Sequence, residues 1–302
     1  MITIAICIPT YKRLELLSHT LKSILVAEIP TGVQLGDCFV VDNDVDQSAK
    51  KFIEEFSSYQ SGIINIVYDN YTVKGLSNVR NKLLELVLNS NADFVAFIDD
   101  DEFVPRHWLK ELIKTQVKFD SDIVVGPVIS ELPKNTPESI KHWISRSKYR
   151  NGQEMKHVSA GNMLIKLDFL REKKLKFDER FNETGAEDTY FGVCAKKLGA
   201  KIHGSQEGYA YETVPKSRAN LSWILKRSFR GASTFVYILK IEKKYLAILK
   251  KSIISLAYII LGILLIPLLL LKSKFKYTGL VKIAEGLGGI SGLINLRYRE
   301  YK

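Results

Sequence analysis

Three acidic residues, Asp99, Asp100 and Asp101, directly follow the wholly apolar run 94–98. Neighbouring carboxylates at the end of a hydrophobic segment repel one another and lose hydration, and a divalent cation relieves both costs. Hard oxygen ligands favour Mg²⁺ or Mn²⁺, and such an ion would neutralise charge on a departing diphosphate. The alternative is a turn whose acids favour the start of the next helix, which holds Trp108. One capping residue would suffice for that purpose, so the cluster favours metal binding.

Glu187 and Asp188 form a second acidic pair, at the start of a segment, 187–198, whose pattern predicts a helix. A carboxylate opposite a leaving group can act as a general base and take the proton of an attacking hydroxyl. The helix macrodipole equally favours acidic residues in a first turn, with Thr184 as the cap. The residues alone leave these two interpretations even.

The elements that would position these acids follow from the hydrophobic pattern. Short β-branched runs alternate with helical patterns, which is typical of βαβ units and a mainly parallel sheet. Because ligands of parallel α/β sheets bind at the carboxyl ends of the strands, the polar strand ends should converge on one site. The sequence therefore predicts an α/β fold with helices flanking the sheet. The predicted strands are 4–8, 39–41, 63–67, 94–98, 123–125 and 163–165, and the polar strand ends are 9–13, 42–44 and 99–101.

The positive charge of the chain is confined to its C-terminal part. The 302 residues carry a formal net charge of +11. From Lys216 onward, 17 Lys and Arg stand against 3 Asp and Glu, a net of +14, which leaves −3 for residues 1–215. Because the excess lies around an apolar span and no basic-aromatic motif accompanies it, nucleic acid is not an expected partner. Anionic lipid head groups fit this placement better.

The segment 253–271 has 19 residues without a formal charge. As a helix it would extend about 28 Å, close to the hydrocarbon thickness of a bilayer. Lysines flank it on both sides, at positions 250, 251, 272, 274 and 276. The alternative is a wholly buried core helix. A second apolar segment, 279–296, carries Lys282 and Glu285. It could lie in the membrane interface, re-enter the membrane or form half of a hairpin. Its Gly288/Gly292 spacing hints at helix packing.

Taken together, these motifs resemble the family 2 glycosyltransferases, which have the GT-A fold, use nucleotide-diphosphate sugars and invert the anomeric centre. The resemblance extends from Ile4 to about Gly231 and rests on the order and spacing of several short segments. They are 8–13 (IPTYKR), 41–43 (VDN), 75–81 (GLSNVRN), 99–101 (DDD) and 185–188 (GAED).

The resemblance implies roles for the strand-end residues. Nucleotide and sugar contacts would come from the three polar strand ends and from one later arginine, namely Pro9, Thr10, Arg13, Asp42, Arg80, Asp99 and Asp100. Asp42 would bind the base, most often uracil in such enzymes. The DxD motif of the family falls on Asp99 and Asp101, so Asp101, with Asp99, would hold Mn²⁺ or Mg²⁺.

The later motifs carry over less completely. Glu187 and Asp188 resemble the ED motif of the family, which makes Asp188 the expected catalytic base. Many of these enzymes have a histidine where Thr213 stands, so another group must replace it here. Glu187, with Arg227 and Arg230 on a predicted helix, would contact the diphosphate or the acceptor; contacts with water or with anionic lipid are the alternative for the arginines.

These inferences predict a catalytic domain over residues 1–235 and a basic, membrane-associated tail over 236–302. The expected partners are a nucleotide-diphosphate sugar, a glycan or lipid-linked acceptor, and a membrane with the catalytic domain on its cytoplasmic side. Two other classes stay open. A sugar nucleotidyltransferase would usually have a glycine-rich loop after the first strand, where this chain has no glycine before Gly32. A non-catalytic membrane adaptor would not need the acidic cluster.

Overall fold

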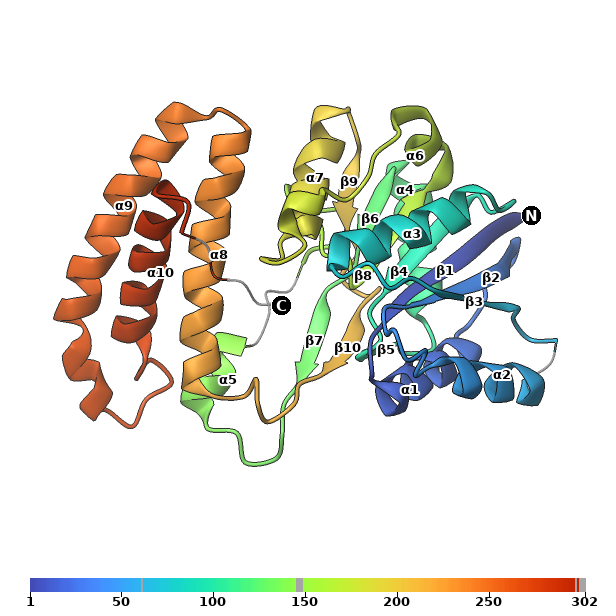
Figure 1. Ribbon diagram of the computed structural model, residues 1–302, viewed down its shortest axis with the longest axis horizontal. Helices are drawn as coiled ribbons and strands as arrows, with labels where there is room; N and C mark the ends of the chain where they lie inside the picture. The colour runs from blue at the N-terminus through green and yellow to red at the C-terminus, as the bar shows by residue number, and fades with distance from the viewer. Residues whose placement is uncertain (61, 145–148, 297, 299–302) are drawn as a thin grey trace. The chain divides into compact units, whose positions relative to one another are not determined.

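The computed structural model describes residues 1–60, 62–144, 149–296 and 298. The chain falls into two compact units (Figure 1). The first comprises 1–129, 146–182 and 187–212, and the second comprises 130–145, 183–186 and 213–302. The predicted boundary at residue 235 falls inside a helix of the second unit, Leu221–Ile241, so it stays a proposal about which residues serve catalysis.

A seven-stranded sheet forms the centre of the first unit, in the order β3-β2-β1-β4-β8-β6-β9. Neighbouring strands are parallel except at β8, which is antiparallel to both β4 and β6. The strands are β1 (Ile2–Thr10), β2 (Val33–Asp42), β3 (Ile66–Asn70), β4 (Phe94–Ile98), β6 (Ile123–Val125), β8 (Asn162–Lys166) and β9 (Ile202–Gly204). A smaller sheet has the order β5-β10-β7 and consists of β5 (Glu102–Phe103), β10 (Ala210–Thr213) and β7 (Val128–Glu131).

Helices cover both faces of the large sheet, and the alternation of side chains along each strand supplies a core on either side. In β4, Val95 and Phe97 face one core, whereas Phe94, Ala96 and Ile98 face the other. The first core includes side chains of α3 (Leu76–Leu88), α6 (Leu167–Lys173) and α7 (Glu187–Lys197). The second includes side chains of α1 (Leu14–Leu25), α2 (Lys50–Tyr59) and α4 (Trp108–Phe119). The predicted fold class is thus confirmed.

The second unit is helical. Its three long helices, α8 (Leu221–Ile241), α9 (Tyr245–Leu264) and α10 (Thr278–Leu293), pack side by side, with α10 against both of the others (Figure 1). The short α5 (Glu138–Ile144) adds Ile140 and Ile144 to a small core with Ile224 and Val281. The described residues also form two short 3₁₀ helices, η1 (Glu179–Phe181) in the first unit and η2 (Ile266–Leu270) in the second.

The charge-free segment 253–271 is not one helix. Helix α9 begins earlier, at Tyr245, and includes Lys250 and Lys251. It ends at Leu264, ahead of η2, which has Pro267 in its first turn. Proline removes a backbone donor and cannot continue a regular helix, which accounts for the early end. Among the described residues, α9 is the single helix long and apolar enough to cross a membrane.

Candidate active site

The acidic turn after β4 is bound to the end of β1. Asp100 is buried, and its Oδ2 accepts hydrogen bonds from the Thr10 hydroxyl (2.8 Å) and the Tyr11 amide (3.4 Å). Its Oδ1 accepts from Arg13 at 3.1 Å. Since β1 and β4 are adjacent parallel strands, their carboxyl ends lie at the same edge of the sheet. Asp100 therefore fixes the turn through hydrogen bonds with three residues at the end of β1 and just after it.

Asp101 lies beside Arg13, with 2.9 Å between Oδ2 and Nη1. Burial, together with the charges of Asp99 and Asp100, raises the pKa of Asp101 to about 7, although Arg13 opposes the shift. Glu212 of β10 adds to the effect. The turn thus holds more negative charge than one arginine offsets, which is the electrostatic condition that favours a bound cation.

Arg80 connects the acidic turn to the Glu187-Asp188 pair. It lies on α3, and its Nη2 donates to Asp99 at 2.8 Å while its Nη1 donates to Glu187 at the start of α7. Arg80 and Glu187 each have only 3% of their side chain exposed, whereas Asp99 retains 32%. Burial lowers the pKa of Arg80, but the charges of Asp99 and Glu187 outweigh it and raise the pKa above its ordinary value. Burial also raises the pKa of Glu187.

Asp188 follows directly in the first turn of α7 and is partly buried. Its charge contributes to the raised pKa of Arg80, so it belongs to the same electrostatic cluster. The two residues before the helix are in the left-handed region, with φ of +70° at both Gly185 and Ala186. A non-glycine residue in that region carries backbone strain, and such residues gather at functional sites. Helix α7 begins at Glu187, directly after these two left-handed residues.

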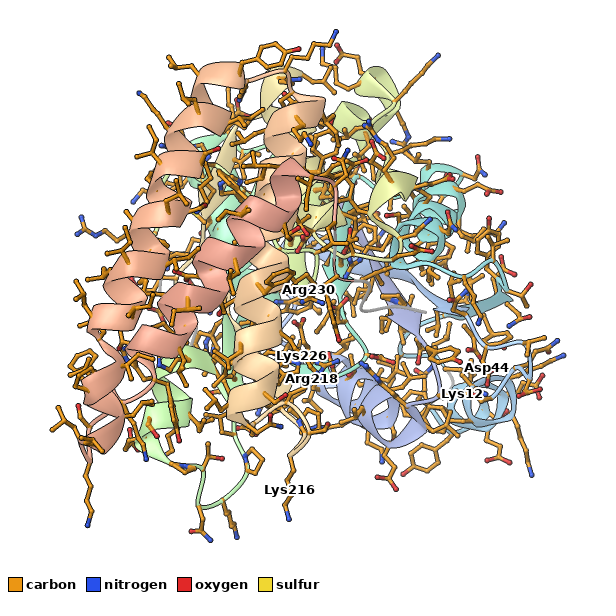
Figure 2. All side chains as sticks on the ribbon, turned by 60° about the vertical axis from the view of Figure 1, so that its left-hand side comes forward. Lys12, Asp44, Lys216, Arg218, Lys226 and Arg230 are labelled. Carbon is orange, nitrogen blue, oxygen red and sulfur yellow. The ribbon has the colours of Figure 1, made fainter. Side chains whose placement is uncertain are left out.

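Asp42 closes the end of β2 and is fully buried. Its carboxylate accepts hydrogen bonds from the amides of Asp44 (3.0 Å) and Ala49 (2.9 Å) and from the hydroxyl of Tyr68 (3.2 Å). Lys12, after β1, pairs with Asp44 at 3.3 Å, and the two side chains lie next to each other in Figure 2. This ion pair connects the segments that follow β1 and β2, so the first two predicted strand ends lie together.

The structure also places Thr20, which the sequence patterns did not single out, and two further acids, Glu102 and Glu212. Thr20 of α1 donates to the backbone oxygen of Asp100 at 3.0 Å and so ties the helix to the turn. Glu102 lies opposite Glu212 in the antiparallel pair of β5 and β10. Glu212 directly precedes Thr213, in a stretch that the family resemblance already included. Its partner strand β5 is two residues long and has no periodicity to detect.

Comparison with known proteins identifies one family. Residues 5–176 match the family described as Glycosyl transferase family 2. The chain belongs to this glycosyltransferase family. It is 30% identical over 239 residues to the succinoglycan biosynthesis protein ExoM of Rhizobium meliloti (strain 1021). The matched region covers 77% of this chain and 73% of the relative. The predicted family is thereby confirmed, and the nucleotidyltransferase alternative loses its basis.

Solved glycosyltransferase structures share the fold at low identity. The S. aureus TarS 1-349 structure in complex with UDP-GlcNAc has a TM-score of 0.56 at 15% identity, covering 99% of this chain and 93% of that chain. GalNAc-T7, solved with UDP, GalNAc and Mn²⁺, has a TM-score of 0.59 at 13% identity, covering 79% of this chain and 48% of that one. At these identities the likeness concerns the fold alone.

The residues of the acidic turn fit a divalent ion by chemistry. Within the described part of the chain, no three His, Cys, Asp or Glu side chains are gathered as a ready metal site. Asp99 and Asp101 supply the oxygen donors that hard cations prefer, whereas both oxygens of Asp100 are already engaged by Thr10 and Arg13. Burial and, to a smaller extent, the charges of Asp99 and Asp100 raise the pKa of Asp101, and a bound cation would oppose that shift. The two outer carboxylates are therefore the candidates to hold the ion.

Arg227 and Arg230 lie on α8 in the second unit, as the predicted helix required. The guanidinium of Arg227 lies 5.0 Å from the ring centre of Trp223, one turn earlier. Pro9 is buried within β1, next to Thr10. Contacts of any of these residues with a diphosphate or a nucleotide stay predictions.

Proposed function

We propose that this glycosyltransferase moves a sugar from a nucleotide-diphosphate sugar, with a UDP-sugar as the expected donor, to an acceptor hydroxyl with inversion. The bridge made by Arg80 is the observation that carries the proposal, because it joins the acidic turn and the Glu187-Asp188 pair in one cluster. Solved relatives of the same fold contain UDP-GlcNAc or UDP, which supports this class of donor. The succinoglycan biosynthesis relative supports an acceptor in cell-surface polysaccharide or glycolipid synthesis.

Asp188 acts as the base in this proposal. It accepts the proton of the acceptor hydroxyl while the oxygen attacks the anomeric carbon and the bond from that carbon to the diphosphate oxygen breaks. One displacement on the face opposite the leaving group inverts the configuration. Arg80 and Glu187 hold the start of α7 and thereby the position of Asp188.

The strand ends hold the donor. Asp42 binds the base, and contacts with the nucleotide or sugar come from Pro9, Thr10, Arg13, Arg80, Asp99 and Asp100. Asp101 and Asp99 would hold Mn²⁺ or Mg²⁺, and the ion would neutralise negative charge on the departing diphosphate. Glu187, Arg227 and Arg230 are the further candidates for diphosphate or acceptor contacts.

Residues 1–235 form the catalytic part in this proposal, and the tail, 236–302, attaches it to the cytoplasmic face of a membrane. The apolar helix α9 and the surplus of lysine around it support that placement. Since nucleotide sugars are made in the cytoplasm, the acceptor would be a glycan or a lipid-linked glycan at that surface.

A panel of UDP-, GDP- and dTDP-sugars tests the proposal, with release of nucleoside diphosphate measured in Mn²⁺ and in excess chelator. We expect one donor class to be consumed, and consumption to stop in chelator. Asp101→Ala should lose metal-dependent donor binding in calorimetry, whereas Asp188→Asn should keep donor binding and lose transfer by at least about a hundredfold. Asp168→Asn, at an exposed acid on α6, is the matched control and should retain full activity. Full transfer by Asp188→Asn would remove it as the base.

A further inference from the structure

Glycines on α10 fix the register of the three long helices. A Cβ atom added to Gly286 would lie 2.5 Å from the backbone oxygen of Ser255 on α9, and one added to Gly288 would lie 2.2 Å from that of Phe229 on α8. Such atoms cannot fit, so the helix backbones touch at these points. Ser255 and Phe229 therefore lie at nearly the same level along the bundle, on opposite sides of α10. The Gly288/Gly292 spacing predicted helix packing, and this is confirmed.

This register places charged residues of α8 level with the middle of α9. Lys226, Arg227 and Arg230 surround Phe229 in the sequence, and Ser255 is at the centre of the helix Tyr245–Leu264. Figure 2 shows Lys226 and Arg230 along α8. Helix α10 adds the ion pair of Lys282 and Glu285 (2.8 Å) at the same level, since Lys282 lies 4.2 Å from the ring centre of Tyr258.

The charges at this level disfavour a transmembrane arrangement of this bundle. A helix of 20 residues is about 30 Å long, so α9 perpendicular to a bilayer would fill the hydrocarbon layer from end to end. Its centre would then lie at the midplane, and so would the three basic residues of α8 and the ion pair of α10. Charged side chains are most costly at that depth.

One long side of α9 is nevertheless apolar and exposed. Ser255 and Gly262 are buried against α10, whereas 11% of the apolar window as a whole is buried. Leu246, Ile253 and Leu264 are exposed and lie in line, because steps of seven and eleven residues return to the same side of a helix. A wholly buried core helix, the alternative from the sequence, is excluded by this exposure.

Exposed lysines lie on α9 and directly after η2. Lys250 lies on α9 itself, and Lys272 and Lys274 follow η2, where Leu270 and Leu271 are also exposed. An apolar strip edged by cations matches an interfacial helix on an anionic membrane, with the strip among the acyl chains and the lysines at the phosphates. A second copy of this chain would bring the same cations face to face.

We propose that α9 lies in the plane of an anionic membrane surface, with its exposed side immersed, and that the described chain makes no crossing there. The inference rests on the membrane attachment in the proposed function and adds its geometry. It also gives a place to residues 279–296, because α10 packs against both α8 and α9 and so supports α9 from the side away from the membrane.

Depth measurements on the full-length protein test the geometry. Single cysteines replace Leu246, Ile253 and Leu264 in a Cys194→Ser background, because Cys7 and Cys38 are buried and Cys194 is not. Each is labelled with a fluorophore and bound to vesicles of phosphatidylcholine with 3 parts in 10 of phosphatidylglycerol. Quenching by lipids that carry quenchers at known depths then gives the depth of each label in the membrane. We expect three equal, shallow depths, about 5–10 Å below the head groups. A label at Ile253 deeper than those at both ends would show a crossing and overturn the inference.

A pair of matched variants tests the lipid as the occupant. Ile260→Glu, at a side chain 62% exposed on α9, should lower vesicle binding about tenfold. Val117→Glu, at a side chain 64% exposed on α4, should leave it unchanged. Equal vesicle binding by both variants would overturn the inference. So would a stable dimer that forms without vesicles and dissociates in the Ile260→Glu variant. These assays need no donor, so loss of sugar transfer alone would count against the proposed function and not against this geometry.

Discussion

The two units depart from the usual partition of side chains in opposite ways. The first buries charge, with Asp100, Glu187 and Arg80 removed from solvent. The second exposes apolar side chains, such as Ile253 and Ile260 on α9. Acids and arginines are rarely buried without partners, and large exposed apolar patches usually mark contact surfaces. This contrast supports the two proposals made above, a charged ligand for the first unit and a membrane surface for the second.

The two departures also differ in how they are stabilised. Buried ions need nearly ideal geometry, because desolvation cancels most of their attraction. Arg80 meets that need with two carboxylates from different elements. The helical unit depends instead on close backbone contact along α10, where glycines leave no room for a side chain. Substitutions that remove a charge should therefore damage the first unit most, and substitutions that add a methyl group should damage the second.

The largest effect is expected at the buried bridge. Arg80→Met leaves Glu187 buried without a counter-charge, which should lower the free energy of unfolding by about 3–5 kcal/mol. Urea denaturation followed by circular dichroism measures this. Lys114→Met is the matched control, since its 3.2 Å pair with Glu111 is on the surface, and its change should stay within about 0.5 kcal/mol.

A double variant sharpens the same point. Arg80→Met with Glu187→Met removes both charges and should recover much of the lost stability, because an apolar pair of similar size is often as stable as a buried ion pair. Sugar transfer should stay low, since the acidic turn and the start of α7 lose the side chains that connect them. Should the double variant be no more stable than Arg80→Met, burial of an unpaired Glu187 would not be the cause of the loss.

An intermediate effect is expected in the helical unit. Gly286→Ala puts a methyl group 2.5 Å from the backbone oxygen of Ser255, and overpacking of this kind costs about 1–3 kcal/mol. Gly231→Ala on α8 is the control, because nothing lies within 4 Å of its added Cβ. Alanine is the better helix former by about 1 kcal/mol, so the control should be more stable than the parent. The same denaturation assay compares them; two variants of equal stability would refute close packing at Gly286.

The smallest effect is expected from single lysines at the border of the apolar side. Lys272→Gln should weaken binding to anionic vesicles by about 1 kcal/mol, or roughly fivefold, and reduce the salt dependence of binding. Lys51→Gln, at an exposed lysine of α2, makes the same charge change in the first unit. Sedimentation of vesicles at two salt concentrations compares the pair. Identical curves for both variants would mean that net charge alone governs attachment.

Much of the first unit was predictable because its signals are local. The strand 94–98 is apolar at every position and is followed by three acids, so both its burial and its end were clear from the sequence. The convergence of strand ends also followed from the parallel topology. By contrast, β2 and β3 differ from their predicted bounds, since their outer residues are set by pairing with neighbouring strands.

What the sequence did not yield depends on contacts between distant segments. The resemblance suggests a nucleotide contact for Arg80, and no local pattern indicates that its side chain lies buried between Asp99 and Glu187, 19 and 107 residues away. The extent of α9 was also hidden, because absence of charge does not mark where a helix begins. Lys250 and Lys251 lie inside it, and Pro267 falls beyond its end.

The position of Asp100 bears on how this enzyme could be rebuilt. Its carboxylate accepts hydrogen bonds from Thr10, 90 residues earlier, and from Arg13. Two loops that are distant along the chain are therefore held in one fixed arrangement. A graft that imports the acidic turn from a relative with a different middle residue would leave the first loop unanchored. Chimeras intended to change donor preference should therefore exchange both loops together.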